Sequence, residues 1–323
     1  MNYTVIKKTS LLFSFILSLV AYVSCKSADV TPVTIHRYDK AIMDMSQDSI
    51  ATELQKLQDE YWVFLQGADL SDTANIRQIK EFKNDEQIRA VWGKIAKTYY
   101  DDKKIGVELA NVFDNTRKVF PSFKNPDVYT YISFFDVQNR VFYFDSILWI
   151  GLDLYVPDNV EQYSAFGIQR YISARLSPEY LMPDVARYTG IKLIERKQTR
   201  TLLDHIVADG KIICFMQSVL PDTKEHILLG YTPAEWAWCK KNEGKLWEYL
   251  AKENLIYESD YNRIRKFIND GPSGNVLEGA PARLSQFVGL RLVSRYLDNT
   301  DKNWDALFKA ETAEVLGTSK YKP

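Results

Sequence analysis

The sequence predicts a mostly helical α+β fold, with a single domain that contains a small antiparallel sheet. Apolar residues recur at helical spacing over most of the chain, and one region rich in β-branched and aromatic residues, 128–156, interrupts them. No repeat, charge block or Pro/Gly/Ser-rich linker divides the 323 residues, so we expect one domain after the N-terminal segment.

The first half of the chain contains both kinds of pattern. A short β-rich stretch at 33–38 predicts a strand, and the next 80 or so residues have helical character. Helices are expected at 46–60, 85–99 and 105–120. Three apolar runs, each dense in β-branched or aromatic residues, then predict the strands of the antiparallel sheet at 128–135, 141–144 and 147–156.

Helical spacing returns after the sheet. Helices are expected at 168–175, 178–188, 199–219, 233–254, 261–269 and 281–297. The start of the fourth fits a capping box, with Thr232 at the N-cap, Pro233 at the first helical position and Glu235 at the third. Trp236 and Trp247 lie about three helical turns apart and share a face, which we interpret as core packing rather than an aromatic binding face.

The composition excludes several functional classes. The chain has 41 basic and 42 acidic side chains, a formal net charge of −1, whereas nucleic-acid-binding proteins usually carry a basic excess. Its three His residues lie far apart and cannot form an HExxH zinc helix, and its three Cys residues form no CxxC pair. We therefore expect no nucleic-acid partner, no metal and no cofactor.

The N-terminus has the pattern of a lipoprotein signal peptide over residues 1–24. Lys7 and Lys8 precede an apolar stretch, Leu11–Val23, that is too short for a comfortable membrane span. It ends at Cys25, the position at which a bacterial lipobox Cys is acylated, although Tyr22 replaces the usual Leu. The alternative is an ordinary secretory signal followed by a chance Cys.

Lipidation of Cys25, for example by palmitate, would attach the protein to a membrane. Each buried CH₂ of an acyl chain contributes about 0.8 kcal/mol, so several chains anchor a protein firmly. We expect a tether at 25–34, a globular domain at 35–323, and a location in the cell envelope, with the outer membrane favoured. The lipid bilayer is then the first expected partner.

Two other features permit a functional and a structural interpretation. A Gly-rich stretch, 271–279, precedes a helix that contains Arg283, Arg291 and Arg295, the last two at i, i+4 on one face. This helix is either a solvated basic face or a docking surface for an acidic partner. Cys214 and Cys239 are either paired in an oxidising envelope or simply buried.

The C-terminal two-fifths of the chain carry a distinctive series of short motifs. They are Gly210-Lys211-Ile212-Ile213-Cys214-Phe215, Leu220-Pro221, Gly230-Tyr231-Thr232-Pro233-Ala234-Glu235-Trp236, Asn242-Glu243, Trp247, Gly271-Pro272, Pro281-Ala282-Arg283 and Gly289. Their order and spacing resemble the gliding-motility lipoprotein GldB family. The resemblance implies an envelope lipoprotein tied to gliding motility and to the associated type IX protein-secretion machinery.

A more distant resemblance concerns chemistry. The stretch 201–215 is similar to the helix of zincin-type peptidases that supplies a third zinc ligand, and Asp209-Gly210 takes the place of that ligand. The upstream zinc helix would fall at 183–187, where no His is present. The resemblance implies a zincin-like scaffold without its metal site, in which Asp184 and Asp209 are the weak catalytic candidates.

Three functions remain open at this point. The favoured hypothesis is a non-catalytic, membrane-anchored lipoprotein that binds other envelope, motility or secretion proteins. The second is a divergent peptidase or hydrolase that uses Asp184 and Asp209 as paired carboxylates. The third is a lipoprotein whose aromatic-lined cleft binds a peptide or a glycan.

Overall fold

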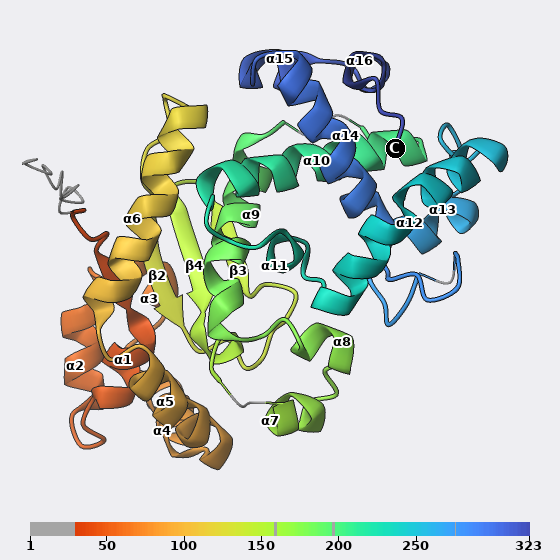
Figure 1. Cartoon of the computed structure of the whole chain (residues 1–323). Helices are drawn as coiled ribbons and strands as arrows, with labels where there is room; N and C mark the ends of the chain where they lie inside the picture. The colour runs from red at the N-terminus through yellow and green to blue at the C-terminus, as the bar shows by residue number, and fades with distance from the viewer. Residues whose placement is uncertain (1–29, 158–159, 196–197, 275) are drawn as a thin grey trace, which may run out of the picture. The chain divides into compact units, whose positions relative to one another are not determined.

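The computed structural model describes residues 30–157, 160–195, 198–274 and 276–323 (Figure 1). Cys25 and the signal peptide therefore lie outside the described residues. Thr31–Pro323 forms one compact unit, mostly helical with a small sheet, as expected for this α+β class. In the part of the chain that the structure describes, no helix is both long enough and apolar enough to cross a bilayer.

The helices fall into two groups, one on each side of the sheet region in the sequence. The first group is α1 (Tyr38–Asp44), α2 (Ile50–Leu57), α3 (Trp62–Leu65), α4 (Thr73–Asn84), α5 (Glu86–Thr98) and α6 (Asp102–Val119). The second is α7 (Val160–Ala165), α8 (Arg170–Ser173), α9 (Leu181–Leu193), α10 (Leu202–Val219), α11 (Glu225–Leu229), α12 (Pro233–Lys252), α13 (Tyr261–Ile268), α14 (Leu284–Asn299), α15 (Trp304–Lys309) and α16 (Thr312–Ser319). Two 3₁₀ turns, η1 (Leu152–Leu154) and η2 (Pro178–Tyr180), follow the sheet.

The prediction of an antiparallel sheet was wrong, because the sheet is mixed. Its strands are β1 (Ile35–Arg37), β2 (Asp127–Tyr131), β3 (Val141–Phe144) and β4 (Ile147–Gly151), in the spatial order β1-β2-β4-β3. β2 pairs in parallel with both β1 and β4, and only β3 and β4 form an antiparallel hairpin. β2 and β4 are central strands, so both are buried over most of their length and show no alternation of buried and exposed residues that would reveal their pairing.

Two strands, β2 and β4, end earlier than expected, and a carboxylate just after β4 binds the chain that follows β2. Asp153, fully buried just after β4, accepts hydrogen bonds from the backbone N–H groups of Ser133 and Phe135, both at 2.8 Å. These bonds pull the chain after β2 away from the sheet. The third strand was expected to continue to residue 156, but β4 ends at Gly151 and residues 152–154 form the 3₁₀ turn η1.

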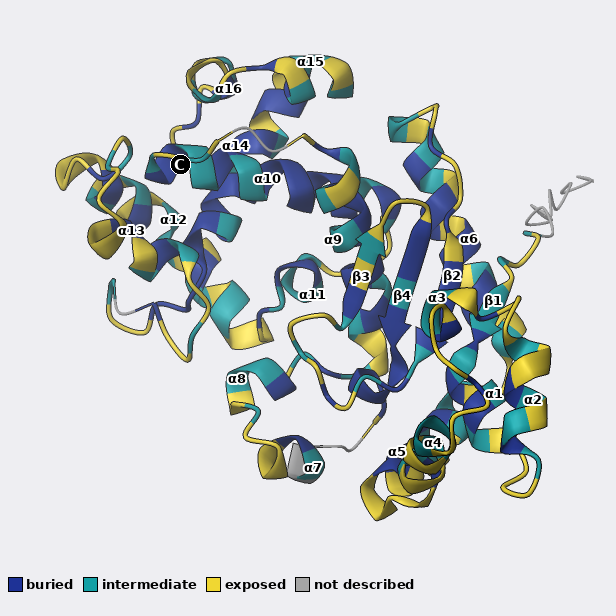
Figure 2. Cartoon of the chain, turned by 180° about the vertical axis from the view of Figure 1, so that it is seen from behind, coloured by how far each residue is buried: buried dark blue, intermediate teal, exposed yellow. Residues whose placement is uncertain are grey.

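Each face of the sheet packs against a different core. Val128 and Leu148 belong to the main core, together with residues of α5, α6, α9, α10 and α14. On the opposite face, Tyr129 belongs to a smaller core formed with α1, α2 and α3, and it stacks on His36 of β1 at 4.7 Å. Figure 2 shows that β4 and α10 are among the most completely buried elements.

Two predicted local features of α12 are confirmed. Thr232 and Glu235 form a complete capping box at its start. Trp236 packs edge-on against Phe287 of α14 at 5.6 Å, and Trp247 packs against Tyr321 at 5.0 Å. Both tryptophans are partly buried against the main core, so they cover its surface rather than fill its centre.

Candidate anion-binding cleft

The two candidate carboxylates are both engaged by neighbouring side chains. Asp184, on α9, is only 6% exposed and accepts hydrogen bonds from Arg140 Nε at 2.6 Å and from the Tyr155 hydroxyl at 2.8 Å. Asp209, on α10, accepts a hydrogen bond from the Ser285 hydroxyl at 2.7 Å. Both carboxylates lie close enough to Arg187 to act on its pKa. The structure therefore places the two aspartates around an arginine.

Arg187 is one of four arginines that line a single chamber. Arg140 precedes β3, Arg175 follows α8, Arg187 lies on α9 and Arg283 directly precedes α14. The chamber has a volume of about 170 Å³, and we call it the inner chamber. Its acidic lining residues are Asp184 and Asp270, so the arginines outnumber the acids lining it by two. The excess of positive charge persists when Asp209 is counted.

Arg140 and Asp184 form the best-compensated pair in the inner chamber. The guanidinium holds the carboxylate through two hydrogen bonds, from Nε at 2.6 Å and from Nη2 at 3.1 Å. Burial disfavours the charge of Arg140, but the Asp184 carboxylate outweighs that effect and raises the pKa of Arg140 above its ordinary value. This bidentate pair fixes the β3 end of the chamber against α9.

Asp270 bridges two further arginines of the inner chamber. Its carboxylate forms ion pairs with Arg175 and, at 3.0 Å, with Nε of Arg283. Burial, followed by the charge of Arg283, lowers the pKa of Arg175. Two guanidinium groups thus share a single acid, and the pair retains a net positive charge.

Arg283 is held rigidly by its backbone and by its contacts. It is 9% exposed, and its φ of 55° places it in the left-handed region directly before α14. Its guanidinium donates to the carbonyl oxygens of Leu229 at 2.6 Å and Gly230 at 3.0 Å, and it lies 5.2 Å from the ring centre of Tyr231. Its Nε lies within ion-pair distance of Asp270 but makes no hydrogen bond.

Arg187 is the least compensated of the four arginines. Its Nη2 donates to the Leu228 carbonyl oxygen at 2.8 Å, and no carboxylate among the described residues lies within ion-pair distance of it. Burial lowers the pKa of Arg187 to about 10; the Asp184 carboxylate opposes this decrease, and the Arg283 charge adds to it. The side chain remains cationic near neutral pH.

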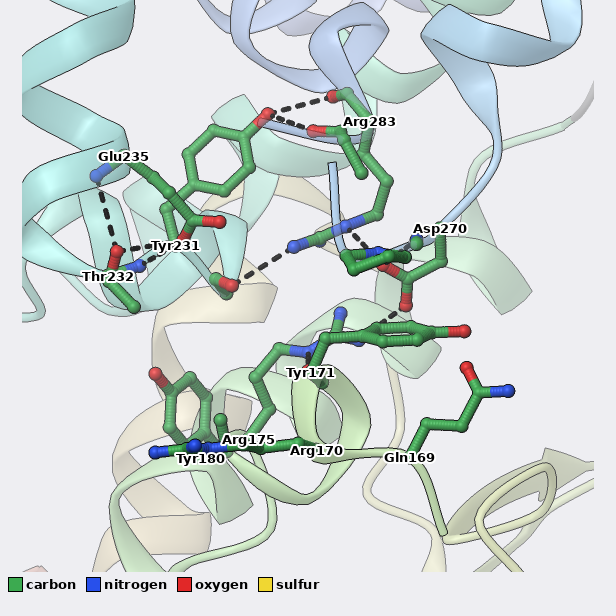
Figure 3. A pocket seen from close by; sticks show the side chains of 15 residues that line it. Gln169, Arg170, Tyr171, Arg175, Tyr180, Tyr231, Thr232, Glu235, Asp270 and Arg283 are labelled. Carbon is green, nitrogen blue, oxygen red and sulfur yellow. Dashed lines mark hydrogen bonds and ion pairs between the residues drawn. The ribbon is translucent and has the colours of Figure 1, made fainter. Parts of the chain in front are cut away.

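A wider outer chamber of about 500 Å³ adjoins the inner one (Figure 3). The two chambers share Arg175, Tyr180, Gly230, Asp270 and Arg283. The outer lining adds the following residues, which include two more tyrosines: Gln169, Arg170, Tyr171, Ala174, Tyr231, Thr232, Glu235, Gly271, Pro272 and Ala282. In Figure 3, Arg283 and Tyr231 lie on one side, and Arg175, Tyr171 and Tyr180 on the other. We call the two chambers together the arginine cleft.

Gly230 lies where the two chambers meet. Its φ of 64° lies in the region that favours glycine, and a Cβ at this position would lie 2.6 Å from Arg175 Cδ and 3.5 Å from Arg283 Nη1. The missing side chain therefore leaves the space that both arginines use.

The three arginines predicted to bind a partner do not form one surface. Arg283 belongs to the arginine cleft, whereas Arg291 pairs with Glu243 at 3.0 Å and is partly buried. Arg295 is exposed, and its guanidinium lies 5.7 Å from the ring centre of Tyr321. Arg291 and Arg295 remain a separate candidate docking face on α14.

The remaining candidate chemistry concerns Cys and metal ligands. Cys214 and Cys239 are free, buried thiols, so the alternative in which they pair is not realised, and burial raises the pKa of each to about 12. Over the described ranges, no group of three or more His, Cys, Asp or Glu side chains is arranged to hold a metal ion.

The sequence analysis missed the roles of Arg140, Arg175, Arg187 and Asp270. They come from four segments between residues 140 and 270, and no fixed spacing relates them. The one available signal was the spacing of Asp184 and Arg187, which lie three residues apart on the same predicted helix.

Residues 23–323 match the family model described as gliding motility protein GldB. No curated protein matches the chain. No solved structure matches it either, so the zincin-like scaffold has no support from that comparison.

Proposed function

We propose a function from the premise that this chain belongs to the gliding motility protein GldB family, whose model covers residues 23–323. The protein is a non-catalytic lipoprotein of the cell envelope, anchored through Cys25 at the outer membrane. It acts by binding other proteins of the motility apparatus or of the associated type IX secretion machinery. Its arginine cleft receives an acidic segment of such a partner.

The observation that carries this proposal is the excess of positive charge in the arginine cleft. Four arginines share two lining aspartates, and Arg187 donates a hydrogen bond to a backbone carbonyl oxygen rather than to a carboxylate. Buried charges in proteins are normally paired, because removing an ion from water without a partner costs several kcal/mol. An acidic segment of a partner would supply the missing negative charge.

The state of the carboxylates argues against the hydrolase alternative. A general acid or base needs a carboxyl group that can reach its substrate and a pKa near the working pH. Asp184 is instead held by hydrogen bonds from Arg140 and Tyr155, and Asp209 accepts a hydrogen bond from the hydroxyl of Ser285. These contacts favour a role for the two carboxylates in holding neighbouring side chains and balancing their charge, rather than in proton transfer.

The tyrosines of the outer chamber favour a related second function, the binding of a peptide or a glycan. Tyr171 and Tyr180 offer apolar ring faces beside the charged groups. A partner segment that combines acidic and apolar residues would use both chambers. Arg291 and Arg295 would form a second docking face for an acidic partner.

Crosslinking in intact cells followed by affinity purification tests the proposed function. We expect Arg187→Glu to lose crosslinked motility or secretion proteins, because the substitution reverses the charge of the cleft. Arg77→Glu, on the exposed face of α4, is the matched charge-reversal control and retains them. The double variant Arg291→Glu/Arg295→Glu tests the α14 face separately. Identical partners in all variants, at equal amounts of folded protein, would contradict the proposal.

A further inference from the structure

We infer that the inner chamber is a specific binding site for one oxyanion group, a carboxylate or a phosphate, held between Arg187 and Arg283. This inference rests on the proposed function, since it names the chemical group that a partner would insert. It goes further in one respect. The site recognises an isolated small oxyanion, so binding does not require the rest of the partner.

The first argument is the balance of charge. Of the four arginines, Arg140 has its own carboxylate in Asp184, while Arg175 and Arg283 share Asp270. Among the residues that the structure describes, no carboxylate lies within ion-pair distance of Arg187. The second acid on α10, Asp209, acts on Arg187 only from a longer range and also accepts a hydrogen bond from Ser285. At least one positive charge is therefore left over.

The second argument is the unused hydrogen-bonding capacity of Arg283. This side chain is nine-tenths buried and lines the inner chamber. Its Nε, although 3.0 Å from Asp270, has no hydrogen-bond partner. Guanidinium groups present several N–H donors in a fixed planar arrangement that matches the oxygen atoms of carboxylate and phosphate. An oxyanion between the two arginines would use this capacity.

The third argument is the rigidity and size of the chamber. Arg187 projects from α9, and Arg283 is fixed in a left-handed conformation at the start of α14. The volume of about 170 Å³ is several times the share of about 30 Å³ that a water molecule takes in the liquid. The chamber thus has room for a small oxyanion group without rearrangement of the helices.

The connection to the outer chamber shows how such a group would be attached to a larger molecule. Arg175, Asp270 and Gly230 line both chambers, and the absence of a side chain at Gly230 leaves room there for the side chains of Arg175 and Arg283. The oxyanion would occupy the inner chamber while the remainder of the ligand lies along the tyrosines outside. A cation is excluded as the ligand, because it would add to the existing excess of positive charge.

Thermal melting of the purified full chain with inorganic phosphate and, separately, with acetate tests this inference. Sodium chloride at the same ionic strength controls for general screening. We expect at least one of the two anions to raise the melting temperature saturably, while chloride does not. Stabilisation by phosphate alone indicates a phosphate-bearing ligand, and stabilisation by acetate alone indicates a carboxylate. The absence of a saturable response to both anions would overturn the inference.

Two variants establish where the anion binds. Arg187→Met keeps most of the side-chain volume but removes the charge, and we expect it to weaken anion binding about tenfold or more, since a hydrogen bond to a charged group contributes at least that factor. In buffer without the anion it should melt no lower than the parent, because it removes a poorly compensated charge. Arg291→Met, whose arginine pairs with Glu243 outside the cleft, should bind the anion as the parent does.

The outcomes separate this inference from the proposed function. An unchanged anion response in folded Arg187→Met places the site elsewhere and refutes the inference. Should Arg187→Met not fold, Arg187→Lys serves instead; it keeps the charge without the planar donors and should bind the anion more weakly. Loss of crosslinked partners in cells without any anion response would leave the proposed function standing and the oxyanion site refuted. If the anion raises the melting temperature but no protein partner is crosslinked in cells, the oxyanion site stands and the proposed function is refuted.

Discussion

Replacement of glycine by alanine inside a helix usually stabilises a protein, but the packing of α10 against α14 predicts the opposite effect at one position. Gly210 and Gly289 face each other where these two helices cross. A Cβ on Gly210 would lie 2.3 Å from the carbonyl oxygen of Gly289, and a Cβ on Gly289 would lie 2.2 Å from the carbonyl oxygen of Ile206. Both obstacles are backbone atoms, which cannot move aside as a side chain can.

Replacement of Gly210 by Ala therefore sets two effects against each other. Alanine is favoured over glycine inside a helix by about 1 kcal/mol. Overpacking of a close contact costs about 1–3 kcal/mol, and a backbone obstacle puts this site at the upper end of that range. We expect Gly210→Ala to lower the free energy of unfolding by about 2 kcal/mol, which corresponds to a melting temperature lower by about 4–8 °C.

Gly93 supplies the matched control. It lies on the exposed side of α5, and a Cβ there would meet no atom within 4 Å. Gly93→Ala should therefore raise the free energy of unfolding by up to about 1 kcal/mol. Circular dichroism melts of both variants measure the two effects. If Gly210→Ala also melts higher than the parent, the two helices do not cross with their backbones in contact, and the reasoning fails.

Four further predictions concern the buried charges, the tyrosines, the anchor and metal content. Asp184→Asn leaves Arg140 without its carboxylate and should lower the free energy of unfolding in urea by about 3–5 kcal/mol; a loss below about 1 kcal/mol would mean that the pair is not buried as described. Burial raises the pKa of Tyr155 and Tyr231 well above 10, so the unfolded chain loses these protons first. Stability should then be complete below about pH 10 and fall above it by about 1.4 kcal/mol per pH unit for each tyrosine, which denaturant midpoints at alkaline pH can test. The Cys25→Ala variant should be lost from the membrane fraction or remain an unprocessed precursor. If it is found with the membranes in the same amount as the parent protein, lipidation of Cys25 is refuted. The purified protein should contain no stoichiometric zinc by elemental analysis, and one zinc per chain would revive the peptidase hypothesis.

The α10–α14 contact also shows what sequence motifs can and cannot reveal. Gly210 and Gly289 were both part of the motif series that resembles the GldB family, so their importance was visible in the sequence. Their shared role was not, because they are separated by 79 positions and meet only when the two helices pack. The motifs therefore singled out the two glycines, and the packing of the helices shows why glycine is needed at both positions.

Elements that depend on neighbouring residues were predicted well. The capping box of Thr232 and Glu235 is confirmed, because it is formed by groups three residues apart. The longer helical stretches were found for the same reason, since their apolar spacing is local, whereas the short helices α11, α15 and α16 were not predicted. Family membership also followed from short motifs in order, and the family model covers the domain on which they lie.

Features that depend on long-range pairing were decided by the tertiary structure alone. The sheet is mixed rather than antiparallel because β2 pairs directly with β4, although β3 lies between them in the sequence. Buried central strands do not show in their sequence which strands they pair with. The arginine cleft arises in the same way, since Arg140, Arg175, Arg187 and Arg283 are brought together from separate segments. The sequence determined where the longer helices lie and which charges the chain carries. Only the fold decided that four of those charges share one chamber, because burial and proximity exist only once the segments have packed.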